Sequence, residues 1–151
     1  MPEPFPLQDL LELARRRSDA AAADLGVLNA LGRDAQQQLQ RLLEFRDEYQ
    51  ARFRDRALGG IDHAAWRNFQ HFMDRLDDAI AMQRDAVEQT HRRAAAGLGH
   101  WQAEQRKAMS FDLLSERHRK AEQLRERRRE QKEHDDRCGA KVAAAQRAHA
   151  G

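Results

Sequence analysis

The side chains that could do chemistry are scattered along the chain, and only one pair has the spacing of a site. His134 and Cys138 are four residues apart, which on a helix places an imidazole and a thiol on one face, as in a two-ligand metal site. No third ligand stands near them. Carboxylates alternate with Arg and Lys, which is typical of a solvated, ion-paired helix face rather than of an acid/base pair. Gly97 and Gly99 lie inside a helical pattern and form no phosphate loop. We therefore expect no enzymatic activity, no cofactor and no metal.

A second candidate is the basic run "RERRRE" at residues 125–130. Such a run can contact nucleic acid, an anionic lipid surface or an acidic protein surface. Between Leu114 and Arg137, however, nine basic residues stand among seven acidic ones, and no aromatic side chain is present to stack on bases. We expect a protein contact or a solvated helix and no nucleic-acid partner. Binding of nucleic acid or of an anionic surface through this Arg-rich helix stays open as the alternative.

A third candidate is a pair of apolar stripes with the spacing i, i+4, i+7, i+11, which places residues on one helix face. The stripes are Gln38, Leu42, Phe45 and Tyr49, and then Phe72, Leu76, Ala79 and Gln83. Two interpretations fit them. The protein could simply be wider there, with extra packing between copies in a purely structural, self-associating coiled coil. Alternatively, the stripes form an exposed apolar patch that binds another protein, which we favour.

The composition favours long helices as the elements that position these residues. Charged residues make up 34% of the chain and aromatic residues 6%, and the three prolines stand at positions 2, 4 and 6. A chain rich in Ala, Glu, Gln, Arg and Leu, with no later proline, is typical of long helices or coiled coils. Disorder is the competing interpretation of high charge, but the sustained apolar period argues against it for most of the length.

One segment, "LGGIDHAAW" at residues 58–66, has the features of a turn between two helices. Gly59 and Gly60 can adopt the left-handed conformation that ends a helix. Asp62 is a natural N-cap for a following helix. Ile61 and Trp66 flank that cap with the spacing of a hydrophobic staple. The sequence thus predicts a helix end followed directly by a helix start.

Apolar or small residues recur at alternating steps of four and three on both sides of this turn, from Leu7 to Phe53 and from Trp66 to Phe111. A seven-residue apolar period of this length favours a left-handed coiled coil. Folding the chain at the two glycines pairs positions whose numbers sum to about 119, so that Phe53 meets Trp66. We therefore predict an all-α fold, a long two-helix antiparallel coiled-coil hairpin whose second helix is longer than the first.

The predicted organisation is one elongated domain over residues 1–151. It comprises a helix at about 7–57, a turn at 58–62, a helix at about 63–137 and a flexible tail at 138–151. Beyond Phe111 the second helix is expected to overhang the first, with no partner in the chain. We call the apolar interface between the two helices the seam. The side of the second helix that continues the seam into this overhang carries Leu114, Arg117, Ala121 and Leu124.

Charge and cysteine content indicate the compartment. The formal net charge is only +2, and the single cysteine excludes an internal disulfide and suits a reducing environment. The N-terminus "MPEPFPLQDL" lacks the pattern of a secretory signal. No run approaches the roughly 18 apolar residues of a membrane span. We expect a soluble, cytoplasmic protein.

Residues 38–84 resemble the flagellar type III export protein FliJ family. The likeness is carried by "QLQRLLEFRDEY", by "GGI" at the turn and by "WRNFQHFMDRLDDAIAMQR", together with similar chain length. Two positions depart from the commoner family pattern. Phe45 stands where a tyrosine is usual, and Gln83 stands where a histidine can occur, so no pH-dependent role is carried over to Gln83.

The resemblance implies a cytoplasmic, non-enzymatic antiparallel coiled coil, similar to the central stalk of rotary ATPases and associated with the export apparatus at the inner membrane. The implied partners are the hexameric export ATPase FliI, the cytoplasmic domain of the export gate protein FlhA and export chaperones. It implies a gate-binding surface at Gln38, Leu42, Phe45, Tyr49, Phe72, Leu76, Ala79 and Gln83. By the stalk analogy, Leu114, Arg117, Ala121 and Leu124 are candidate contacts to the ATPase ring.

Overall fold

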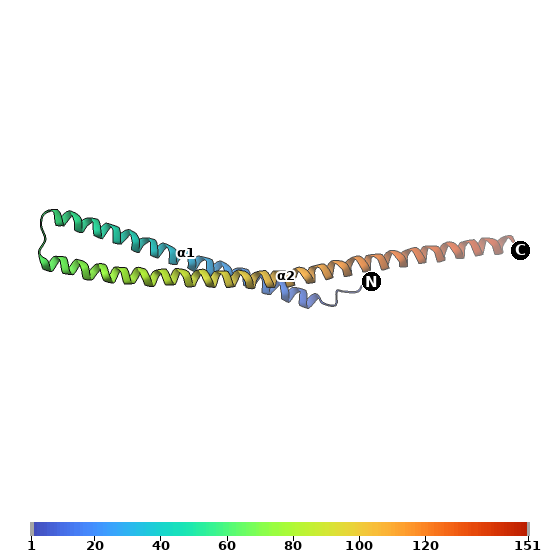
Figure 1. Ribbon diagram of the computed structural model, residues 1–151. Coiled ribbons are helices and arrows are strands. Elements are labelled where there is room, and N and C mark those ends of the chain that lie inside the picture. The colour runs from blue at the N-terminus through green and yellow to red at the C-terminus, as the bar shows by residue number, and fades with distance from the viewer. Residues whose placement is uncertain (1, 151) are drawn as a thin grey trace. The chain divides into compact units, whose positions relative to one another are not determined.

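The computed structural model describes residues 2–150 and contains two α-helices (Figure 1). α1 spans Gln8–Leu58 and α2 spans His63–His149. No strand occurs within residues 2–150. The helices pack against each other in antiparallel directions, and α2 is the longer one. The predicted all-α hairpin with a longer second helix is therefore confirmed.

The turn between the helices is built by backbone hydrogen bonds and one side-chain cap. The amides of Gly59 and Gly60 donate to the carbonyls of Arg56 and Ala57, and Gly60 has a φ of 91°, a conformation that side chains with a Cβ rarely adopt. The Asp62 carboxylate then accepts from the amide of Ala65 at 2.8 Å and caps α2. These bonds pair several of the polar groups that the two helix ends would otherwise leave free.

The chain forms two compact units, each containing parts of both helices. Unit 1 consists of Met1–Arg17 with Glu104–Gly151, and unit 2 consists of Ser18–Ala103. Residues 1 and 151 lie outside the described part of the chain, so the expected single domain over 1–151 stays a prediction. Unit 2 holds the main core, formed by Leu39, Phe69, Met73, Leu76 and Ile80. Unit 1 buries Leu11, Ala14 and Ala108, together with the carboxylates of Glu104 and Glu122.

The register of the hairpin in unit 2 follows the predicted pairing near the turn. The rings of Phe53 and Trp66 lie 5.9 Å apart. Farther along, the side-chain amide of Gln83 donates to the carbonyl of Ala35 at 2.9 Å. Helical side chains lean toward the N-terminus of their own helix. In an antiparallel pair, side chains that meet therefore belong to residues whose numbers sum to slightly more than the value of about 119 counted from the turn. Arg46 accordingly reaches Asp77 at 2.7 Å.

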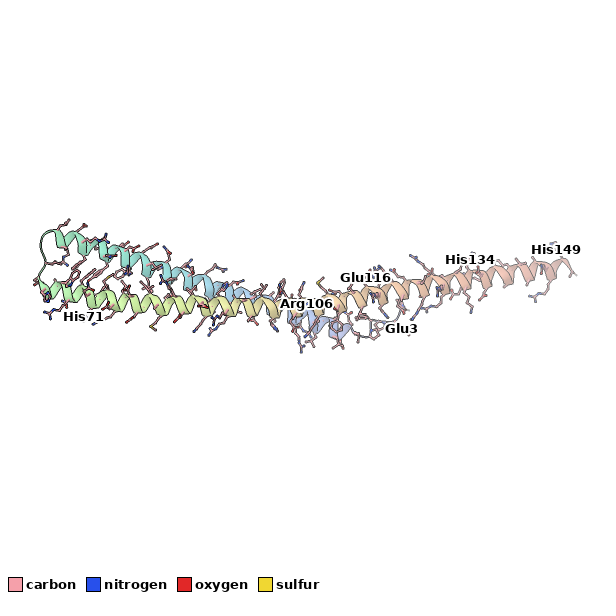
Figure 2. All side chains as sticks on the ribbon, in the orientation of Figure 1. Glu3, His71, Arg106, Glu116, His134 and His149 are labelled. Atoms are coloured by element: carbon pink, nitrogen blue, oxygen red, sulfur yellow. The ribbon has the colours of Figure 1, made fainter. Side chains whose placement is uncertain are left out.

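In unit 1 the N-terminal segment packs on α2, a contact that no pattern in the sequence predicts. The backbone amide of Glu3 donates to Glu122 Oε2 at 3.2 Å, and His118 Nε2 donates to the Glu3 carbonyl at 2.9 Å. The rings of Phe5 and His118 lie 5.7 Å apart. Figure 2 shows Glu3 beside α2. We call residues 2–7 the N-terminal strap. The expectation that α2 has no partner beyond Phe111 was therefore wrong at His118 and Glu122.

α2 also continues farther than expected, to His149 rather than to about 137. The segment after Cys138 is rich in alanine, the residue with the highest helix propensity, and lacks proline. Almost every side chain from 127 to 150 is exposed, so local propensity alone holds this part of the helix. Flexibility of the tail stays a prediction, and its last residue, 151, lies outside the described part.

Candidate partner-binding surface

An aromatic cluster spans both helices of unit 2 between the turn and the middle of the hairpin. The ring of Tyr49 on α1 lies between two rings of α2, with its centroid 4.4 Å from that of Phe72 and 5.7 Å from that of Phe69. Phe53 stacks on Phe69 at 3.8 Å. Such pairs add to the free energy of burial when offset or tilted. The cluster therefore fixes how α1 and α2 face each other here.

Phe45 stands at the edge of this cluster and is 44% exposed. Its ring is 6.1 Å from Phe72, in a T-shaped arrangement, and 6.2 Å from Tyr49. One side of the ring thus packs against aromatic neighbours while the other meets solvent. A large apolar side chain held by its neighbours and open to water is a typical anchor for a protein partner.

The eight residues of the two predicted stripes differ in exposure. Gln38 and Phe45 are exposed, and Leu76 belongs to the buried core. The remaining five are half-buried, namely Leu42, Tyr49, Phe72, Ala79 and Gln83. The structure brings Phe45, Tyr49 and Phe72 together directly. The stripes therefore belong partly to the seam and partly to the surface beside it.

Gln83 has a structural bond of its own. Its side-chain amide donates to the Ala35 carbonyl on α1, and the group is partly buried. Within a helix that carbonyl already accepts a backbone bond, but its second lone pair is free to accept another. Gln83 therefore ties α2 to α1, a role that its place in the predicted stripe did not indicate.

The opposite side of the hairpin in unit 2 has a different character. There Arg46 donates to Asp77, and this hydrogen bond, followed by the Coulombic attraction of the same carboxylate, raises the pKa of the Arg46 guanidinium. Both side chains are substantially exposed, so solvent screens the pair.

The four predicted contacts to an ATPase ring, Leu114, Arg117, Ala121 and Leu124, are all exposed. Their spacing places them on one side of α2. The N-terminal strap packs against a neighbouring side, at Ser115, His118 and Glu122, where it borders an open groove of about 450 Å³. The strap therefore leaves the four predicted residues uncovered.

The remaining chemical candidates have ordinary surroundings. Cys138 Sγ lies 3.9 Å from the His134 ring nitrogens, and no cluster of three metal-ligating side chains occurs within residues 2–150. In the basic run, Arg125 pairs with Glu122 and Arg129 pairs with Glu126. These ion pairs neutralise part of the positive charge locally. Over the described part of the chain, neither helix contains a segment apolar and long enough to cross a membrane.

The fold and surface together define a helical-hairpin protein with an exposed aromatic edge beside the interface of its two helices. A family model described as "Flagellar FliJ protein" matches residues 3–147. The flagellar FliJ protein of Escherichia coli (strain K12) is 29% identical over 136 residues, covering 90% of this chain and 92% of the relative. That of Salmonella typhi is 28% identical over 130 residues, covering 86% and 88%. The chain belongs to the flagellar FliJ family and is thus a component of flagellar protein export.

Proposed function

We propose that this chain is a non-enzymatic export chaperone or escort and a stalk-like link between the ring of the export ATPase FliI and the export gate protein FlhA. On this proposal it works in the cytoplasm, peripherally associated with the export apparatus at the inner membrane, and hands over export chaperones. Its contact to the cytoplasmic domain of FlhA is the surface that contains Phe45.

The observation that carries the proposal is the exposed ring of Phe45 next to Phe72. Phe45 is not needed to close the seam, because the core beneath it is formed by Leu39, Phe69 and Leu76. Exposing 44% of the surface of a phenylalanine residue to water is unfavourable, and burial against a partner recovers that free energy. Its packing on Tyr49 and Phe72 limits the conformational entropy lost on binding.

The gate contact is tested by measuring affinity for the purified cytoplasmic domain of FlhA by titration calorimetry. Phe45→Ala is expected to weaken binding at least about tenfold, the effect of losing a buried anchor. Phe45→Tyr keeps the ring and is expected to bind like the wild type. Leu58→Ala, at an 88% exposed position, controls for loss of an unrelated apolar side chain. If Phe45→Ala and the wild type bound the cytoplasmic domain of FlhA with equal affinity, the proposed contact at Phe45 would be wrong.

The ATPase contact rests on the exposed set Leu114, Arg117, Ala121 and Leu124. Replacing Leu114 and Leu124 with glutamine removes their apolar groups without disturbing a core, since both are at least 41% exposed. The double variant is expected to retain FlhA binding and to lose retention of FliI in a pull-down. Unchanged capture of FliI would place the ATPase contact elsewhere.

The alternatives predict different behaviour. Binding to nucleic acid or to an anionic surface would weaken steeply with salt, because phosphate contacts release counterions. The ion pairs of Arg125 and Arg129 do not favour it. A purely structural, self-associating coiled coil would sediment as a stable dimer that dissociates on Phe45→Ala.

A further inference from the structure

The eight predicted gate-binding residues expose too little surface for a stable complex. A standard interface buries about 800 Å² on each partner and involves some 20–30 residues a side. Here only Gln38 and Phe45 are exposed, Leu76 is in the core, and the others are half-buried. If the surface binds the gate as proposed, further residues of the hairpin must contribute to it.

The observed Phe45–Phe72 contact gives the direction in which the surface continues. Seven residues are close to two helical turns, so steps of seven stay on one side of each helix in a coiled coil. One step away from the turn leads from Phe45 to Gln38 on α1, and from Phe72 to Ala79 on α2. A second step leads to Leu31 and Ala86. These pairs form three rungs of one ladder in unit 2.

The hydrogen bond between Gln83 and Ala35 shows that the helices keep this register along the ladder. Ala35 lies between Leu31 and Gln38 on α1, and Gln83 lies between Ala79 and Ala86 on α2. The pair Leu31 and Ala86 therefore follows the pair Gln38 and Ala79 in the same way that this pair follows Phe45 and Phe72. Leu31 is 47% exposed, close to the exposure of Phe45, and Ala86 is half-buried.

Charged residues end the ladder on both helices in the direction away from the turn, and on α1 toward the turn. One step beyond Leu31 and Ala86 come Asp24 and Arg93, and one step toward the turn from Phe45 comes Arg52. All three are exposed, whereas the corresponding step from Phe72 on α2 leads to Ala65, which is half-buried. The ladder thus extends from Leu31 to Phe45 on α1, fourteen residue steps or about 21 Å at 1.5 Å per residue. It has two bulky ends, at Phe45 with Phe72 and at Leu31, separated by Gln38 and Ala79.

We infer that Leu31, with Ala86 beside it, is a second anchor of the gate contact. This inference rests on the proposed function, because it takes the cytoplasmic domain of FlhA as the occupant of the ladder. The partner would present an apolar strip about 20 Å long whose two ends meet the rings at Phe45 and the side chain of Leu31, with polar groups toward Arg52, Asp24 and Arg93.

The test compares the full-length protein with Leu31→Gln and Leu98→Gln, titrated with the FlhA cytoplasmic domain. Leu98 is 42% exposed on the opposite side of the hairpin, where it borders a groove with His91, and so it is a matched control. Leu31→Gln is expected to weaken binding about tenfold, as loss of a half-buried leucine contact predicts. Leu98→Gln and the conservative Leu31→Met are expected to bind like the wild type. Circular dichroism melting should be unchanged in all three.

The outcomes separate the inference from the proposed function. Wild-type affinity of Leu31→Gln together with weak binding of Phe45→Ala would overturn the second anchor and leave the gate contact in place. Wild-type affinity of both variants would overturn both. Loss of self-association in Leu31→Gln, with gate affinity unchanged, would assign the ladder to a second copy of this chain and overturn the inference as well.

Discussion

At the residue scale, neighbouring side chains of the same type have different roles. Phe69 and Phe45 belong to one aromatic cluster, yet Phe69 is 9% exposed and contacts three rings, those of Tyr49, Phe53 and Trp66. Phe45 touches two rings at the edge of the cluster. The free energy that each contributes to folding should therefore differ, although both look alike in the sequence.

We expect Phe69→Ala to lower the free energy of unfolding by about 3–4 kcal/mol and Phe45→Ala by less than about 1.5 kcal/mol. The first change removes a buried ring and leaves a cavity, whereas the second removes a ring already open to water. Urea unfolding followed by circular dichroism measures both. Equal losses would mean that Phe45 is part of the core and would remove the physical basis for its role as an anchor.

Glu122 predicts a pH dependence for the N-terminal strap. The hydrogen bond from the Glu3 backbone amide, aided by the charges of Arg125, His118 and Arg129 and opposed by burial, lowers the pKa of Glu122. The folded state therefore binds fewer protons here than the unfolded state, and the strap contact is fully present above the ordinary pKa of about 4.3. It should be lost as the pH falls through the lowered pKa.

The strap is followed by the chemical shifts of the Phe5 ring and the Glu3 amide in an acid titration. Glu122→Gln keeps an acceptor for the Glu3 amide but cannot titrate, so the transition in this pH window should disappear. The same transition in Glu122→Gln would assign it to another carboxyl group.

At the element scale, the seam needs small residues where the helices approach closely, and α2 supplies them. A methyl group on Gly97 would stand 2.6 Å from Leu28 Cδ1 on α1, closer than carbon atoms pack. On Gly99, two residues later in the same helix, a methyl group would meet no atom within 4 Å apart from the neighbouring backbone of its own helix. The two glycines therefore have the same cost in backbone entropy, but only at Gly97 does the packing of α1 require a residue without a side chain.

Gly99→Ala is expected to raise the free energy of unfolding by about 0.5–1 kcal/mol, since alanine is the better helix former. Gly97→Ala gains the same propensity but displaces Leu28, so it should give no net gain or a loss of about 1 kcal/mol or more. The difference between their melting temperatures is the measurement. An equal gain from both would mean that Leu28 moves aside freely.

At the scale of the whole molecule, stability is distributed unevenly because the two helices are packed unevenly. The core of unit 2 holds five buried apolar residues in one cluster. From 127 to 150, by contrast, almost all side chains of α2 are exposed. An unpacked helix is held only by its backbone bonds and local propensity, and its stability is marginal in water.

Native-state hydrogen exchange should therefore show the slowest amides at residues 69–80 and the fastest helical amides at 130–149. Phe69→Ala should speed exchange in the first segment and leave the second unchanged. Protection at 130–149 equal to that at 69–80 would point to packing of the distal helix that the isolated chain does not have, such as association between copies.

Sequence alone determined the all-α hairpin, because heptad spacing, proline-free length and the Gly-Gly-Ile-Asp signal are local properties of consecutive residues. It also placed the two stripes at one height along the hairpin, since equal rise on both helices needs only counting from the turn. The family resemblance found in those same residues supplied the functional hypothesis, and the family membership is confirmed over residues 3–147.

Only the tertiary structure decided how deeply each stripe residue is buried and what it contacts. Heptad spacing already placed Leu42, Tyr49, Leu76 and Gln83 in the interface between the helices, and Phe45 and Phe72 beside it. Each side chain leans along its helix toward one of several neighbours, so spacing could not show that Gln83 bonds to Ala35 or that Phe72 packs on Tyr49. The strap was missed for a related reason. Its contacts join Glu3 to Glu122, 119 residues apart, and no periodic pattern in the chain reports a pairing made by an irregular segment.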